Sequence, residues 1–212
     1  MKREKLYSGQ LWKILFFSLF TFTYSLIHAQ TPNERQAREI FDKVWNSMYG
    51  PQGATLHYSV NIIGIYKTEG TIWQKGKKSK YQSDNSKMWN DGKTCYVVKK
   101  KEVTIFDAND KSRDKHASKF QFEPNNYTYH IADDKEGLLI TIKQKSSKVK
   151  GVSEVRLLID RHTFAPKRLR IKVGLIHATI HISQFRSGGL DDSIFTFPRE
   201  LYQGYKFVDK RQ

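Results

Sequence analysis

The sequence has little cysteine, no long apolar run and few acidic residues for its number of basic ones. Its single cysteine excludes an intrachain disulfide framework and a cysteine-rich zinc site. No apolar run reaches the ~18–20 residues of a transmembrane helix. Lysine and arginine number 37 against 21 aspartates and glutamates, so the formal net charge is +16. Because 38% of the 212 residues are hydrophobic and 13% aromatic, the chain can still form a core, and a wholly disordered chain is excluded.

Motifs of known catalytic sites are also missing. There is no G-x-S-x-G, no H-E-x-x-H and no phosphate-binding glycine loop. Asp133-Asp134 and Asp191-Asp192 have the surroundings of turns, and Cys95 is expected to be a small buried hydrophobe within a strand. His177 and His181 resemble a metal pair, but strand alternation places both on a polar side without a third ligand. We therefore expect neither an enzyme nor a cofactor or metal site.

The first 29 residues have the pattern of a secretory signal peptide. Four basic residues between positions 2 and 13 precede a short apolar stretch, Ile14–Ile27, and then His28-Ala29. This order predicts cleavage after Ala29, and the apolar stretch is short for the alternative, a membrane anchor. No cysteine lies near the cleavage position, so the mature protein is expected to carry no lipid anchor. An exported basic protein is expected to meet anionic membrane surfaces or acidic partners rather than nucleic acid.

An amphipathic helix is predicted directly after this segment. Thr31-Pro32-Asn33-Glu34 has the pattern of a capping box with proline at the first helical position. Gly50-Pro51 predicts the end of the helix. Between these signals, six apolar residues at helical spacing form one stripe, which must cover an apolar surface: Ala37, Ile40, Phe41, Val44, Trp45 and Met48.

From residue 54 onward the hydrophobic period changes to two, which predicts strands of an antiparallel sheet with one apolar and one polar face. Asp91-Gly92 is a hairpin signal within this region. We see no internal repeat and no linker, so residues 30–212 are expected to form one domain. One helix is too small to cover such a sheet, which must therefore curl or leave apolar surface facing a ligand. The predicted strands include Leu56–Ile62, Cys95–Val98, Val103–Phe106, Leu138–Ile142, Val155–Ile159, Leu169–Val173 and Ile176–Ile182.

Aromatic residues are frequent although catalytic groups are absent, which favours an apolar binding pocket. The segment Ala108–Asn126 is rich in Asp, Lys and Asn and is predicted to be a mobile flap. Which strand residues face the pocket stays open, because either sheet face can be apolar near a barrel closure. The candidates for its lining are Ile40, Val44, Tyr58, Val60, Trp73, Tyr81, Trp89, Tyr96, Phe120, Phe122, Tyr129, Ile140, Leu157, Leu169, Ile171, Ile180 and Ile182.

Several short motifs follow one another in a recognisable order. Gly70–Lys75 contains Trp-Gln-Lys, Trp89–Thr94 contains Asn-Asp-Gly-Lys, and the chain closes with Phe195-Thr196-Phe197 and Asp209-Lys210-Arg211. Residues 31–212 thereby resemble the outer-membrane lipoprotein carrier family, the LolA-like proteins, as a divergent branch. The family's Arg-Pro after Trp-x-Lys is replaced here by Gly76-Lys77, which puts the lid latch of that arginine in doubt.

The resemblance implies a mainly β fold with α (α+β). The fold would be a half-open antiparallel β-barrel whose N-terminal amphipathic helix covers the concave apolar face. It also implies a monomeric periplasmic carrier whose cavity shields lipoprotein acyl chains between the inner and outer membranes. The implied partners are acylated lipoproteins, an inner-membrane lipoprotein-releasing transporter and an outer-membrane acceptor. The alternative is a periplasmic lipid- or lipoprotein-binding sensor of the same fold.

Overall fold

The structure is a computed structural model that describes residues 30–62, 66–108, 124–146 and 152–211. The expected signal peptide, residues 1–29, lies outside the described residues. So do most of the expected flap and its Phe120 and Phe122. Residues 33–212 form one compact unit. No helix among the described residues combines the length and the apolar character that crossing a membrane requires.

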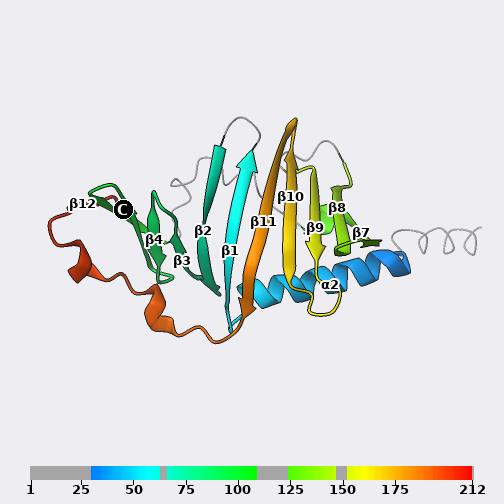
Figure 1. The fold of residues 1–212 in the computed structure, drawn as a ribbon, viewed down its shortest axis with the longest axis horizontal. Helices are drawn as coiled ribbons and strands as arrows, with labels where there is room; N and C mark the ends of the chain where they lie inside the picture. Colours follow the sequence, from blue (N-terminus) through cyan, green and yellow to red (C-terminus); the bar gives the residue numbers. More distant parts are fainter. Residues whose placement is uncertain (1–29, 63–65, 109–123, 147–151, 212) are drawn as a thin grey trace, which may run out of the picture. The chain divides into compact units, whose positions relative to one another are not determined.

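A single sheet of twelve strands forms most of this unit (Figure 1). Its order is β12-β6-β5-β4-β3-β2-β1-β11-β10-β9-β8-β7, and all neighbours are antiparallel except the parallel pair β12 and β6. The sheet is open, with β12 and β7 at its edges. The predicted fold class, a half-open antiparallel barrel with an N-terminal helix, is confirmed. The strands are β1 Ala54–Ile62, β2 Tyr66–Lys75, β3 Lys78–Gln82, β4 Lys87–Asn90, β5 Thr94–Lys99, β6 Glu102–Asp107, β7 Tyr127–Asp134, β8 Gly137–Gln144, β9 Glu154–Ile159, β10 Pro166–Val173, β11 Ile176–Ser187 and β12 Lys206–Asp209.

The hairpin between β4 and β5 forms where the sequence predicts it. The Asp91 carboxylate accepts hydrogen bonds from the backbone N–H groups of Lys93 and Thr94, both at 2.8 Å. Gly92 has φ +94°, which a residue with a side chain rarely adopts. The side chain of the buried Asn90 accepts a further bond from the Gly92 N–H at 2.8 Å. Local turn chemistry therefore fixes the register of the two strands.

The N-terminal helix, α2, spans Pro32–Tyr49, with the bounds that the capping signals and Gly50 predict. Its buried residues Ala37, Ile40 and Val44 pack on a cluster formed by β7, β8 and β9. In Figure 1, α2 runs across the strands from β7 to β11. The apolar stripe that helical spacing produces along α2 thus packs on one face of the sheet, at β7, β8 and β9.

The pairing registers assign each strand residue to a face, because directly paired residues point to the same side and successive residues alternate. We name the side that α2 covers the helix face and the other side the far face. Leu157, Leu169, Ile180, Val60 and Thr68 are paired in succession across β9, β10, β11, β1 and β2, and all lie on the helix face.

The last part of the chain covers the far face at the other end of the sheet. After β11 the chain passes through the 3₁₀ helices η5 (Asp192–Phe195) and η6 (Arg199–Tyr202) and ends in β12. Tyr202 is buried against Trp89, Val98 and Val103, which belong to β4, β5 and β6. The two ends of one sheet are therefore covered on opposite faces by different elements.

Candidate functional site

An apolar cavity of about 320 Å³ lies between α2 and strands β8–β11. None of the described residues that line it carries a charged side chain. The first half of α2 packs on the sheet through Ala37 and Ile40, and the second half lines the cavity through residues between Phe41 and Tyr49. The lining residues are Phe41, Val44, Trp45, Met48, Tyr49, Ile142, Val152, Val155, Leu157, Pro166, Leu169, Ile171 and Ile182.

Aromatic rings form the helix side of this cavity. Phe41 and Trp45 have ring centroids 6.0 Å apart, and Trp45 and Tyr49 have theirs 4.3 Å apart. Trp45 is 46% exposed and Tyr49 39% exposed, although both line the cavity. Large apolar surface at the rim of an apolar cavity indicates a ligand site rather than a closed core.

The tyrosines around the site stay uncharged at neutral pH. Burial raises the pKa of Tyr129 to about 12, although the nearby Arg38 guanidinium, 5.0 Å from its ring centroid, acts in the opposite direction. Burial also raises the pKa of Tyr49. A phenol with a raised pKa keeps its proton, so the cavity offers no charge to a ligand.

Polar contacts hold α2 at both ends. The Asn33 side chain donates to the Ile131 carbonyl at 2.8 Å and accepts from the Ile131 N–H at 3.0 Å, so the helix start is joined to the edge strand β7. Near the helix end, the Ser187 hydroxyl donates to the Ser47 carbonyl at 3.0 Å. On either side of Ser47 in the sequence, Trp45 and Tyr49 line the cavity and stay partly exposed.

Five of the predicted lining residues meet in the cavity: Val44, Leu157, Leu169, Ile171 and Ile182. Ile40, Tyr129 and Ile140 lie in the core directly under α2. Tyr58, Val60, Tyr81 and Ile180 lie on the same helix face nearer the middle of the sheet, where Tyr58 and Tyr81 stack with centroids 6.0 Å apart.

Three predicted residues are not brought together with the others. Trp73, Trp89 and Tyr96 point to the far face. In the pairing registers they are out of phase with the strand residues that lie on the helix face. Trp89 and Tyr96 pack on Phe197 of the C-terminal segment, at centroid distances of 5.5 and 4.4 Å. The Lys80 amine lies 4.9 Å from the Trp73 ring centroid. Packing against the C-terminal segment, and not a ligand, buries the Trp89 and Tyr96 rings.

Sequence reasoning also missed eight lining residues. Phe41, Trp45 and Met48 belong to the predicted apolar stripe of the helix, so the stripe itself was a signal for them. Ile142 and Val155 alternate in phase with Ile140 and Leu157, which was a second signal. For Tyr49, Val152 and Pro166 the sequence holds no comparable pattern, because their position depends on how chain segments meet.

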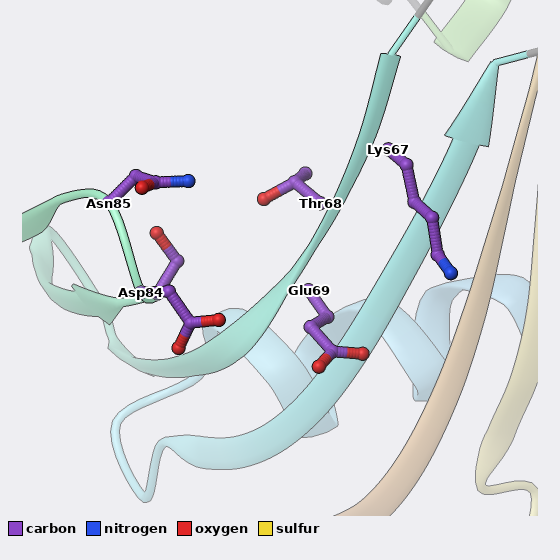
Figure 2. Close-up of a pocket in the computed structure, with 6 residues that line it drawn as sticks. Lys67, Thr68, Glu69, Asp84 and Asn85 are labelled. Atoms are coloured by element: carbon purple, nitrogen blue, oxygen red, sulfur yellow. The ribbon is translucent and has the colours of Figure 1, made fainter.

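A second recess, of about 230 Å³, has the opposite chemistry. It lies between β2 and the turn that joins β3 to β4, and its lining is polar throughout (Figure 2). Acids, a lysine, hydroxyls and an amide share this lining, so the recess does not suit an acyl chain. Its residues are Lys67, Thr68, Glu69, Ser83, Asp84 and Asn85.

Comparisons with solved structures identify proteins of similar fold. An uncharacterised conserved protein from Thermus thermophilus matches with a TM-score of 0.57 and 13% identity, over 82% of this chain and 99% of its own. MucB matches with a TM-score of 0.50 and 10% identity, over 82% of this chain and 66% of its own. A LolA superfamily protein from Nitrosomonas europaea is also matched, with a TM-score of 0.38 and 10% identity, over 77% and 98%.

No protein-family model and no curated protein matches the sequence. At 13% and 10% identity, the matches to the Thermus thermophilus protein and to MucB show a similar fold and nothing beyond it. The apolar cavity under α2 is the most distinctive site among the described residues of this chain.

Proposed function

We propose that this protein is a periplasmic carrier that shields the acyl chains of lipoproteins and ferries them from the inner to the outer membrane. The observation that carries the proposal is the cavity between α2 and β8–β11, whose described lining residues carry no charge and include Tyr49, a phenol with a raised pKa. Apolar contacts are non-directional, so such a site suits cargoes that share only their lipid.

The energetics of an acyl chain require a carrier of this kind. Each CH₂ group buried contributes ~0.8 kcal/mol, so an anchor with several chains does not cross water unshielded. The cavity of about 320 Å³ is at the small end of the ~300–1,000 Å³ range of ligand sites. We propose that a larger anchor is accommodated by outward movement of the end of α2, where Trp45 and Tyr49 are partly exposed. The same movement would release the cargo.

The remaining parts of the proposal follow from the sequence resemblance. A lipoprotein-releasing transporter in the inner membrane would load the protein, and an acceptor at the outer membrane would unload it. The signal-peptide pattern of residues 1–29 supports the periplasm as its location. The protein would act as a monomer, as the resemblance implies.

Neighbouring positions on β11 allow a direct test of the cavity. Ile182 lines it, whereas Ser183 is exposed on the far face. With a photo-reactive amino acid at either position, the protein is incubated with inner-membrane vesicles that contain a labelled lipoprotein. We expect crosslinking to the acyl anchor from position 182 and none from position 183. Equal crosslinking from both positions would overturn the assignment.

A matched pair of substitutions tests whether the cavity is needed. Ile182→Glu places a charge in an apolar site, which is costly without a partner, so we expect release of lipoprotein from the vesicles to fall at least tenfold. Ser183→Glu places the same charge in water and should leave release unchanged. Circular dichroism and thermal unfolding establish that both variants are folded.

One observation favours a second candidate, a lipid- or lipoprotein-sensing module of the same fold. At the position of the family's latch arginine the chain has Gly76, with φ +53° and no side chain. Its backbone N–H bonds to the Gly50 carbonyl at 3.3 Å, beside the end of α2. A sensor would bind the acyl ligand with the same dependence on Ile182 but would release no lipoprotein from inner-membrane vesicles.

A further inference from the structure

The β10–β11 hairpin carries the most exposed large hydrophobic residue described in this chain. Gly174 and Leu175 form its turn, with Gly174 at φ +58°. Leu175 is 97% exposed, compared with 72% for Leu201. A single exposed leucine is ordinary on a protein surface, so its surroundings decide whether it has a role.

Those surroundings are strongly basic on one side. On the far face of β8–β11, six cationic side chains accompany a single carboxylate, that of Glu154, and the seventh cation of these strands, Lys167, lies at a register shift beside Pro166 and pairs with Asp160. Glu154 pairs with Lys143 and Arg156, and Arg168 pairs with Glu136. The six cations are Lys143, Arg156, Arg168, Arg170, Lys172 and Arg186.

The two cations of β10 that lie nearest to Leu175 in the sequence are unpaired among the described residues, although Glu154, the register partner of Lys172 on β9, lies on the same face and pairs with Lys143 and Arg156. Neither Arg170 nor Lys172 forms an ion pair with any carboxylate of the described residues, and Arg170 is exposed. Lys172 precedes Leu175 by three residues and Arg170 by five. An apolar tip and two free cations therefore share one hairpin.

We infer that the β10–β11 hairpin docks on the surface of an anionic phospholipid bilayer. Leu175 enters the interface, and Arg170 and Lys172 face the phosphate headgroups. Near an anionic membrane each Lys or Arg contributes about 1 kcal/mol, and an inserted apolar side chain adds to this. An acidic protein would compensate the cations equally well, but it would leave the leucine at the tip without a partner.

Docking by this hairpin would also bring the cavity to the membrane. Ile171 of the same strand lines the cavity from the helix face, and it alternates with Arg170 and Lys172 on the far face. One strand thus presents cations on one side and the lipid-sized cavity on the other. The inference goes beyond the proposed carrier function, since membrane docking can be measured without cargo.

Vesicle flotation with the mature protein tests the inference. The probes are vesicles of phosphatidylcholine alone and vesicles that also contain phosphatidylglycerol. We expect binding to the phosphatidylglycerol vesicles and its weakening about thirtyfold in Arg170→Gln/Lys172→Gln. Leu175→Ser should weaken it about tenfold.

Matched controls separate these effects from bulk charge and bulk hydrophobicity. Lys99→Gln/Lys100→Gln removes two exposed cations at the β5–β6 turn, and Leu201→Ser removes another highly exposed leucine. Both controls should bind within twofold of the native protein. Binding of an acyl ligand, measured in every variant, should not change, so failure of the docking site and failure of the cavity are distinguishable.

Three results would overturn the inference. The first is the absence of native binding to either vesicle. The second is equal weakening by the hairpin variants and their controls, which would mean bulk charge alone. The third is weakening by the charge pair without any effect of Leu175→Ser, which would identify an acidic surface as the partner and exclude insertion of the tip.

Discussion

At the scale of single residues, glycines set how closely strands approach one another. Gly137 begins β8, and a Cβ atom at this position would lie 2.0 Å from the Ile159 carbonyl oxygen of the adjacent strand. Gly76 also has a positive φ, +53°, but a Cβ there would meet no atom within 4 Å. Substituting Gly76 therefore tests the free-energy cost of the backbone conformation alone, whereas substituting Gly137 adds the cost of a close approach between strands.

We predict that Gly137→Ala destabilises the protein by at least about 3 kcal/mol, because a clash with the backbone adds to the unfavourable conformation. Gly76→Ala should cost only about 1 kcal/mol. Urea unfolding of the two variants measures both values. Similar losses in the two variants would mean that β8 and β9 can move apart at little cost.

At the scale of elements, the C-terminal segment is attached to the β2–β3 hairpin by one carboxylate. Asp192 at the start of η5 lies 2.8 Å from the Lys75 amine and 2.6 Å from the Lys78 amine. Hydrogen bonds from Lys75 and Lys78 lower the pKa of Asp192 to about 2. Because the group is exposed, the ion pairs are screened by solvent and their contribution to stability is small.

The lowered pKa gives this contribution a defined pH dependence. An unfolded aspartate has a pKa of about 3.9, so the stabilisation is fully present above pH ~4 and is lost as the pH falls to about 2. We predict that Asp192→Asn is less stable than the native protein at pH 6 and equally stable near pH 2. Urea unfolding of both proteins across this range is the measurement, and a constant difference down to pH 2 would contradict the assigned ion pairs.

At the scale of the whole molecule, one sheet connects two cores that lie on opposite faces. The first consists of α2 with β7, β8 and β9, and the second consists of the C-terminal segment with β4, β5 and β6. Strand β1 lies between the two ends and pairs along its length with β2 and β11. Continuous pairing of this kind favours cooperative unfolding of both cores.

Cys95, the chain's one cysteine, reports on the β4–β6 end of the sheet, because it is buried with 0% exposure in β5, on the face opposite to the second core. Asn33→Ala removes the two hydrogen bonds to Ile131 in the first core and should cost about 1–2 kcal/mol. We predict that the urea midpoint falls equally by circular dichroism and by thiol labelling of Cys95. A midpoint of labelling that stays unchanged would indicate that the two cores unfold separately.

Much of the fold was predictable from local patterns. The capping signals and Gly50 predicted the bounds of α2, Asp91-Gly92 predicted the β4–β5 hairpin, and period-two alternation predicted the main strands. Each of these signals lies within a few residues of the feature that it specifies, because hydrogen bonding in turns and caps is local. Alternation also predicted correctly that His177 and His181 lie together on one face of their strand, opposite to Ile182.

The tertiary structure alone decided which face receives which cover. In β4 and β5 both sides of the strands are apolar, as Met88 beside Trp89 and Tyr96 beside Val97 illustrate. Alternation therefore shows which of these residues share a face, but it does not show which face lines a cavity. Phe197, about a hundred residues later in the chain, packs on Trp89 and Tyr96. This contact makes the face that carries Trp89 and Tyr96 part of a buried structural cluster. The cavity under α2 likewise depends on how far a helix stands from four strands, which is a property of packing between distant segments and of no local sequence pattern.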